Sequence, residues 1–252
     1  MLATVPLFAG LTVLDPRTLD GAPLWAKPLK FSVSLAVFFL TLAMFRRWLD
    51  RGATERLWYR VTVGALTLAL AYESAWLWSY TARGQRSHFN TDGAALLHYN
   101  LAGLFAFVLV LGALAFGLSA WRARRVRPDP VVTEGVALGL VLTFVLTTIV
   151  AFPLAATNGA LGGSPSGPGA GWFGWRVEGS DLRAAHFFAT HAMQAVPLLA
   201  WLSARLLPRG PALLVLRLCA AGYALFVGRL AIGAFLGDDL PWFLHDLAAA
   251  GR

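Results

Sequence analysis

Cysteine, lysine and charged side chains are scarce in this chain. The single cysteine, Cys219, excludes an intramolecular disulfide and a cysteine-based metal cluster. The two lysines, Lys27 and Lys30, lie at the start of a hydrophobic run, which argues against a Schiff base with a buried retinal. Charged residues make up 13% of the 252 residues, whereas a soluble domain carries roughly 25%. The sequence therefore lacks the charged surface of a soluble globular protein.

Long hydrophobic runs fill most of the remaining sequence. Hydrophobic residues make up 58% of the chain, and the mean hydropathy is +0.63. A run of about 20 apolar residues is long enough for an α-helix to cross the hydrocarbon core of a bilayer. We therefore predict an all-α, polytopic integral membrane protein in which residues 1–252 form a single transmembrane helix bundle. Six spans are expected, at about 29–48, 57–80, 94–120, 131–156, 182–207 and 212–236.

Arginine is distributed unevenly over the loops between these runs. The loops at one end carry a net charge of +8, and the other end carries −1. Because basic loops stay in the cytoplasm, we expect a bacterial-type cytoplasmic (inner) membrane with both termini outside. The basic charge thus reflects topology, so membrane lipids, and not nucleic acid, are the expected partners. The basic loops hold Arg46, Arg47, Arg51, Arg56, Arg60, Arg122, Arg124, Arg125, Arg127, Arg205, Arg209 and Arg217.

All five histidines are predicted to lie on the outer side of the membrane. Glu73 and Arg229, the deepest ionisable residues of the predicted spans, lie toward the same side, each about 10 Å from its span end by helical rise. At equal depth they are candidates for an ion pair, which either fixes helix packing or belongs to a proton or ligand site. Ionisable groups inside a membrane are costly and typically mark a functional site. The histidines are His88, His98, His186, His191 and His245.

Histidines from different helices at similar depth are candidate ligands for haem b or for a divalent metal ion. His186 and His191 are five residues apart and so differ by about 140° around one helix. The alternative is that each histidine only hydrogen-bonds to a neighbouring helix or to water. The expected metal ligands are His98, His186 and His191, and the candidate catalytic groups are Glu73 and His191. An anion clamp for a lipid phosphate or a haem propionate is expected from Arg83, Arg86 and Arg183.

Two outer segments and one glycine tract complete the prediction. Residues 157–180 form a long loop rich in Gly, Pro and Ser, interpreted either as a lid over the histidines or as a flexible insertion. Residues 238–252 are expected to form a short helix at the outer interface. The tract from Gly135 to Gly139 has the spacing of close helix packing, which is favoured here over dimerisation.

Three classes of function fit these residues. The first is a haem- or metal-dependent membrane redox protein or enzyme with its site in the outer half of the bundle. The second is a proton-coupled transporter that uses Glu73, His191 and Arg229. The third is a non-catalytic sensor, lipid-binding protein or assembly factor that recognises a small molecule, a lipid or a partner on the outer side. The sequence leaves open whether the chain is an enzyme.

Overall fold

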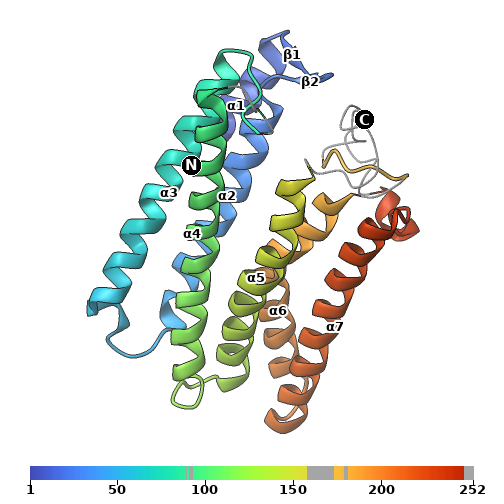
Figure 1. Ribbon diagram of the computed structural model, residues 1–252. Coiled ribbons are helices and arrows are strands. Elements are labelled where there is room, and N and C mark those ends of the chain that lie inside the picture. Colours follow the sequence, from blue (N-terminus) through green and yellow to red (C-terminus); the bar gives the residue numbers. More distant parts are fainter. Residues whose placement is uncertain (89, 91–92, 158–172, 179–180, 247–252) are drawn as a thin grey trace. The chain divides into compact units, whose positions relative to one another are not determined.

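The computed structural model describes residues 1–88, 90, 93–157, 173–178 and 181–246, and this part of the chain is mainly helical (Figure 1). Strands β1 (Thr18–Leu19) and β2 (Ala22–Pro23) pair in a small antiparallel hairpin. Short 3-10 helices lie at Arg46–Trp48, Ala53–Glu55 and Trp242–Leu244. The described α-helices are α1 (Thr4–Leu14), α2 (Ala26–Phe45), α3 (Leu57–Ala82), α4 (Ala94–Ala123), α5 (Pro130–Ala156), α6 (Leu182–Leu206) and α7 (Arg209–Leu236).

The six predicted spans coincide with helices α2 to α7, which confirms the all-α class. Five of these helices, α2, α3, α4, α5 and α7, are long and apolar enough to cross a membrane. Helix α6 lies outside that set although it has 25 residues, because Arg183, His186, His191 and Gln194 lower its hydropathy. The sixth span and the side on which the termini lie therefore stay predictions.

Two further expectations concern short segments. Helix α1, with 11 residues, is apolar but too short to span a bilayer. The expected interface helix over 238–252 is described only to residue 246 and contains the 3-10 helix Trp242–Leu244. Most of the predicted lid, residues 158–172 and 179–180, lies outside the described residues.

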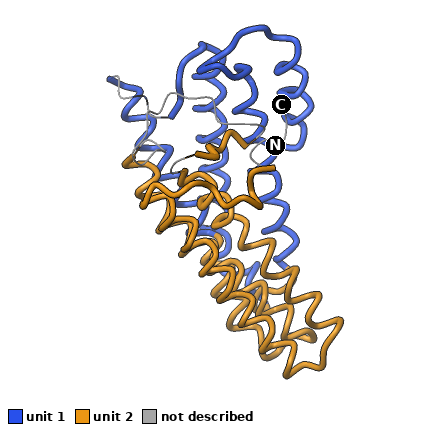
Figure 2. The backbone as a smooth tube through the Cα atoms, turned by 90° about the vertical axis from the view of Figure 1, so that its right-hand side faces the viewer, with its two compact units in different colours: residues 1–46, 52–112 blue, residues 47–51, 113–252 orange. Residues whose placement is uncertain are grey.

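The chain divides into two compact units (Figure 2). Unit 1 contains residues 1–46 and 52–112, and therefore α1, both strands, α2, α3 and the first part of α4. Unit 2 contains residues 47–51 and 113–252, and therefore the last turns of α4 with α5, α6 and α7. Each unit has its own hydrophobic core and is described by itself below. The single transmembrane domain over residues 1–252 stays a prediction.

Helix boundaries in unit 2 follow the local chemistry of the sequence. The Asp129 carboxylate accepts a hydrogen bond from the backbone N–H of Val132 at 3.0 Å, and Pro130 occupies the first turn, where a missing N–H costs nothing. Helix α7 ends at Gly237, whose φ of +80° is a left-handed conformation that glycine adopts without steric strain. These signals fix where α5 begins and where α7 ends.

Helices α5 and α6 approach each other closely at the two glycines of the predicted packing tract. A Cβ atom at Gly139 would lie 2.8 Å from the Cδ atom of Pro197 and 2.9 Å from the carbonyl oxygen of Ala192. A Cβ atom at Gly135 would collide with the side chain of Ala200. Small residues allow this approach, and close packing is a main source of helix association in lipid. The tract therefore serves packing within unit 2, as predicted.

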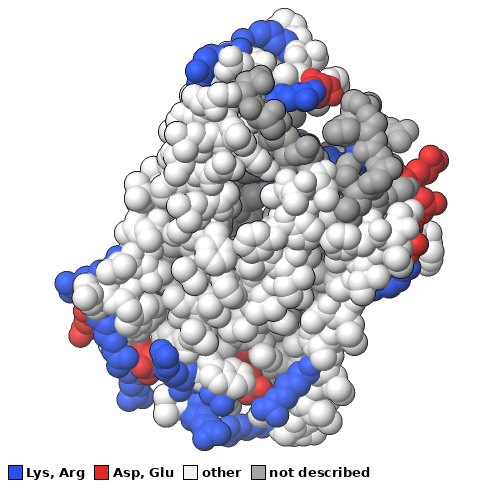
Figure 3. Space-filling model, in the orientation of Figure 1, with Lys and Arg blue, Asp and Glu red and all other residues white. Residues whose placement is uncertain are grey.

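A buried carboxylate joins α5 to α7 at the basic end of unit 2. Figure 3 shows Lys and Arg side chains gathered at the end that carries the α4–α5 and α6–α7 connections. Glu134 of α5 is 4% exposed and forms an ion pair of 2.7 Å with Arg217 of α7. Arg124 lies 3.9 Å from the same carboxylate. Because an unpaired buried charge is strongly unfavourable, Glu134 depends on these arginines, and its contact with Arg217 links α5 to α7.

We expect Gly139→Ala to destabilise unit 2, because the added methyl group would press on the rigid ring of Pro197 and on a backbone carbonyl. Overpacking of this kind typically costs about 1–3 kcal/mol. Gly222→Ala in α7 is the matched control, since nothing lies within 4 Å of a Cβ atom at that position. Unfolding midpoints measured in detergent should fall only for Gly139→Ala. Equal midpoints for the two variants would contradict the close α5–α6 contact.

Candidate functional site

One face of α3 buries a carboxylate next to large aromatic side chains. Glu73, Trp76, Leu77 and Tyr80 follow the i, i+3, i+4, i+7 spacing that places side chains on a single helix face. All four are buried, with Glu73 5% and Trp76 4% exposed. A carboxylate is thus held on the same face as two large aromatic rings.

Two polar atoms on this face lack a partner. Among the described residues, neither Oε1 of Glu73 nor the Nε1–H group of Trp76 has a hydrogen-bond partner. The two residues are three positions apart, so they lie on one helix face with their Cα atoms about 4.5 Å apart along the axis. A buried polar atom without a partner costs roughly 1–3 kcal/mol. The pair therefore offers two complementary contacts to a bound polar group.

Aromatic rings from four segments, α2, α3, the following loop and α4, gather around Trp76 and His88. The His88 imidazole lies 4.7 Å from the Trp76 ring, 5.4 Å from Phe31 of α2 and 6.0 Å from Tyr99 of α4, between ring centroids. The Tyr80 ring lies 6.2 Å from Trp76. Such tilted and edge-to-face pairs stabilise packing beyond the area they bury. We call Phe31, Trp76, Tyr80, His88 and Tyr99 the aromatic cluster.

His98, a predicted metal ligand, lies beside this cluster on α4. The Tyr72 hydroxyl is 3.0 Å from Nδ1 of His98 and 3.4 Å from its backbone carbonyl oxygen. The Tyr80 ring lies edge-on to the imidazole at 6.1 Å. Helices α3 and α4, two of the predicted spans, are therefore neighbours in unit 1.

A lysine supplies positive charge to the same region. Lys27 lies half-buried in the first turn of α2, and its charge acts on the nearby His88 imidazole. No ion pair joins Lys27 to Glu73 within the described part of the chain. Burial of the imidazole, and then the charge of Lys27, lower the pKa of His88 well below its usual value of 6.5. The loop histidine is thus kept neutral against the aromatic cluster.

The state of His88 predicts a pH dependence of stability. Below pH 6.5 an unfolded chain takes up a proton at His88 that the folded chain does not, so folding stability falls as the pH decreases through that range. We expect His88→Phe, which keeps a ring and removes the titration, to flatten this loss. Unfolding midpoints at about pH 7.5 and about pH 5.5 measure it. The same loss in wild type and His88→Phe, with His245→Phe as control, would contradict the assignment.

The polar rim of unit 1 is internally paired. The Asp15 carboxylate binds the Arg17 guanidinium at 2.7 Å and accepts a hydrogen bond from the Trp25 indole, and these contacts lower the pKa of Asp15. Of the predicted anion clamp, Arg86 donates from Nε to Asp20 at 3.0 Å. Arg83 donates to the backbone carbonyl of Ser79 at 2.9 Å and lies over the Tyr80 ring.

The remaining predicted site residues lie on α6, in unit 2. The third clamp residue, Arg183, binds the buried carboxylate of Asp181 at 2.7 Å, and Asp181 also accepts hydrogen bonds from the backbone N–H groups of Arg183 and Arg176. His186 and His191 are both half-buried. The Nδ1 atom of His191 lies 3.2 Å from Oε1 of Gln194. The three clamp arginines thus already have partners in their own units.

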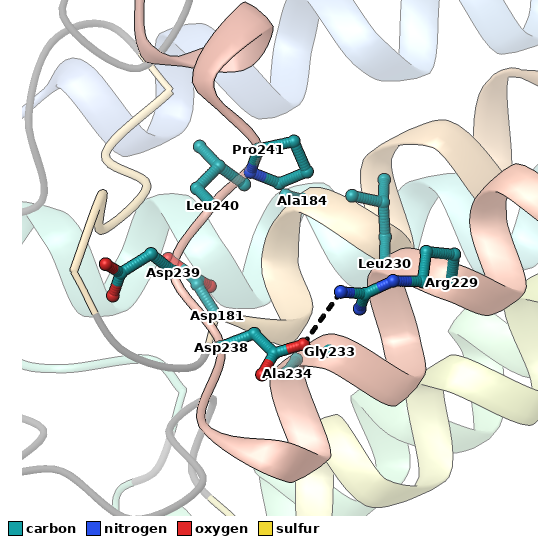
Figure 4. Close-up of a pocket in the computed structure, with 10 residues that line it drawn as sticks. All are labelled: Asp181, Ala184, Arg229, Leu230, Gly233, Ala234, Asp238, Asp239, Leu240 and Pro241. Atoms are coloured by element: carbon teal, nitrogen blue, oxygen red, sulfur yellow. Dashed lines mark hydrogen bonds and ion pairs between the residues drawn. The ribbon is translucent and has the colours of Figure 1, made fainter.

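Arg229 has a partner within unit 2 that the sequence did not indicate, and the ion pair with Glu73 of unit 1 stays a prediction. The Arg229 guanidinium binds Asp238 at 2.8 Å, with side-chain exposures of 65% and 40% (Figure 4). Both residues line a pocket of about 30 Å³ between the start of α6, the end of α7 and the segment that follows it. That volume suits a group the size of a water molecule. Arg229 reaches the Asp238 carboxylate because the chain turns at Gly237, directly after α7.

The predicted metal ligands and clamp arginines are distributed over both units. Unit 1 brings Glu73 together with the aromatic cluster and with His98, whereas His186, His191 and Arg183 lie in unit 2. Within the described ranges, no group of three or more His, Cys, Asp and Glu side chains is arranged to hold a metal ion. A haem needs only two histidines, so its ligation by His98 with His186 or His191 stays a prediction.

The sequence interpretation missed Lys27, Tyr72 and Trp76 as members of a site. The spacing Glu73-x-x-Trp76-x-x-x-Tyr80 was the available signal, because it places the carboxylate and both rings on one helix face. Comparison of the chain with protein-family models, with curated proteins and with solved structures found no match. The function is therefore inferred from the site alone.

Proposed function

We propose that this chain is a multi-pass membrane protein that binds a polar small molecule or lipid headgroup at the end of unit 1 where α3 ends and α4 begins. Glu73 accepts a hydrogen bond from the ligand, and the Trp76 indole donates one. By the positive-inside rule, the arginine-rich loops favour an outer position for this end of unit 1 in a cytoplasmic membrane. The role is recognition, such as sensing or lipid binding, and no chemical step is assigned.

The observation that carries this proposal is the paired absence of partners at Glu73 Oε1 and Trp76 Nε1. Buried polar groups in proteins are nearly always hydrogen-bonded to protein, water or ligand. Thr143, Thr147 and Thr148 of α5 also have unpartnered hydroxyls. Threonine can satisfy itself by rotating toward the carbonyl four residues earlier, as Thr41 does with Val37 at 2.7 Å. An indole N–H group has no such local option, so Trp76 requires an external acceptor.

The contacts of unit 2 weaken the transport alternative. That hypothesis needs Glu73, His191 and Arg229 along one pathway, yet Arg229 is occupied by Asp238 and His191 lies beside Gln194. Recognition at a single end of unit 1 needs only Glu73 and its neighbours. We therefore favour a binding protein over a proton-coupled carrier.

Native mass spectrometry of the gently purified protein tests the proposal. We expect wild type to retain a bound molecule that Glu73→Gln and Trp76→Phe each lose, with occupancy reduced roughly tenfold or more, because each change leaves a buried group of the complex unpaired. Glu55→Gln and Trp78→Phe are the matched controls, since Glu55 is exposed and Trp78 packs against Phe8 at 5.4 Å, outside the aromatic cluster.

Two results would refute the binding site. One is a wild-type spectrum with no adduct in gentle detergent and in lipid nanodiscs. The other is an adduct whose occupancy is the same in Glu73→Gln, Trp76→Phe and the two controls. Helical content and elution volume of each variant separate loss of binding from loss of folding.

A haem or divalent metal ion is the second candidate, and the contact between Tyr72 and His98 favours it. In the tautomer with the proton on Nδ1, this nitrogen donates to the Tyr72 hydroxyl at 3.0 Å, and Nε2 keeps a lone pair for a ligand. Metal-binding histidines typically have their second nitrogen held in this way.

Absorption spectra of the oxidised and dithionite-reduced protein test the haem hypothesis. A bound haem predicts a Soret band that shifts on reduction and disappears in His98→Ala, because an axial ligand is lost. His245→Ala is the control, as its Nε2 atom lies 2.7 Å from the Leu240 carbonyl oxygen. A spectrum without a visible band removes haem and leaves a colourless metal ion, for which metal analysis of the same variants is the readout.

A further inference from the structure

We propose that the basic end of unit 2 holds a binding site for an anionic phospholipid, in which the Arg124 guanidinium, held against the Trp121 ring, binds the lipid phosphate. The site lies where the end of α4, the start of α5 and α7 meet around Glu134. It involves unit 2 alone and does not depend on the proposed function of unit 1. A general attraction of anionic lipids to arginine-rich loops requires no particular residue, whereas this site requires Arg124.

The first argument is an excess of positive charge around Glu134. Arg217 donates to the two oxygens of this carboxylate, at 2.7 and 3.3 Å, and so satisfies it. Arg124 Nε lies 3.9 Å from the same carboxylate, which is beyond hydrogen-bond distance. The basic end of unit 2 as a whole has nine arginines and three carboxylates, a net charge of +6. This excess attracts anions from outside the chain, and the phosphates of anionic lipids are the anions that a membrane surface supplies.

The second argument is that Arg124 is held in place while some of its donors stay available. Its guanidinium carbon lies 3.7 Å from the centroid of the Trp121 ring, and its Nη1 donates to the Trp121 backbone carbonyl. Among the described residues, Nε and Nη2 of Arg124 have no hydrogen-bond acceptor. Stacking on a ring covers the face of a guanidinium and leaves the N–H groups in its plane, which match the geometry of a phosphate. The side chain is therefore ordered before the ligand binds.

The third argument is the exposed apolar surface next to this guanidinium. Trp121 is 37% exposed, and Leu118, three residues earlier on the same side of α4, is 43% exposed. Tryptophan is typical of the boundary between hydrocarbon and headgroups, so Arg124 lies at the level of lipid phosphates. An acyl chain can pack along Leu118 and Trp121 while its phosphate binds Arg124. A free phosphate makes only the second of these contacts, so the combination favours a lipid.

Two other helix ends of unit 2 pair an arginine with a tryptophan. Arg205 lies over the Trp201 ring at 4.8 Å, and Arg47 lies over the Trp48 ring at 4.0 Å. Neither arginine shares a carboxylate with a second arginine among the described residues. Only at Arg124 do a stacked guanidinium and a neighbouring excess cation coincide in the described part of the chain. We therefore place the site at Arg124.

Lipid titration of the delipidated full-length protein in detergent, followed by native mass spectrometry, tests the site. The probes are dioleoylphosphatidylglycerol, dioleoylphosphatidylcholine with the same acyl chains, and soluble glycerophosphoglycerol. We expect phosphatidylglycerol to bind at least about tenfold more tightly than phosphatidylcholine. Arg124→Gln should weaken this binding roughly tenfold, because charge-assisted hydrogen bonds to the phosphate are lost, while Glu134 keeps its partner Arg217. Arg209→Gln is the matched control, since it removes the same charge from an exposed position outside the site and should change binding less than about twofold.

Unfolding midpoints of the same variants separate loss of the site from loss of the fold. Phosphatidylglycerol should raise the midpoint above that in phosphatidylcholine for wild type and Arg209→Gln, and not for Arg124→Gln. If Arg124→Gln also lowers the midpoint in phosphatidylcholine, Trp121→Leu takes its place and should weaken phosphatidylglycerol binding roughly threefold, because the ring that holds the guanidinium is lost. Unchanged binding in that variant overturns the site.

Three further results would overturn the inference. Equal binding of the two lipids would remove selectivity for an anionic headgroup. Equal weakening by Arg124→Gln and Arg209→Gln would reduce the effect to the general charge of the surface. Displacement of phosphatidylglycerol by an equal concentration of glycerophosphoglycerol would show that the acyl chains contribute nothing, so the ligand would be a free phosphodiester and not a lipid.

Discussion

A membrane interior offers no water to hydrogen-bond with, so each polar group inside it needs a partner from the protein, from the lipid or from a ligand. This constraint explains most polar contacts of the chain. Glu134 lies buried with Arg217 in contact and Arg124 nearby, and Asp181 binds Arg183 and two backbone N–H groups. Glu73 departs from this rule. Its position therefore carries more information about function than the paired charges, which are explained by folding alone.

The helices were predictable because they depend on local properties. An apolar run of sufficient length forms a helix in lipid, and boundary residues such as Pro130 stop or start it within a few positions of the observed ends. Helix α6 is long enough but does not meet the hydropathy criterion for a membrane span, since polar residues such as His186 and His191 interrupt its apolar sequence. The packing role of Gly139 was also predictable, because glycines four residues apart on one helix allow a neighbouring helix to approach closely.

The candidate site was predicted only in part. The depth of a residue along its own helix follows from its position in the sequence, whereas its contacts with residues of other segments do not. Glu73 was identified from its depth, and His98 was placed at the correct end of α4. The Asp238 partner of Arg229 was missed, because Asp238 lies nine residues after Arg229 and reaches it once the chain turns at Gly237. Trp76 was overlooked because a tryptophan in an apolar run resembles core packing until its N–H group is found without an acceptor.

The contact between Gly139 and Pro197 has a consequence for how this sequence can vary. The proline ring occupies the space that any larger side chain at position 139 would need, so the two positions form one steric unit across α5 and α6. A larger residue at 139 therefore requires a smaller residue at 197 together with a small shift of the α6 backbone at Ala192. In related chains these positions should therefore vary jointly, and their covariation would reveal the α5–α6 register without a structure.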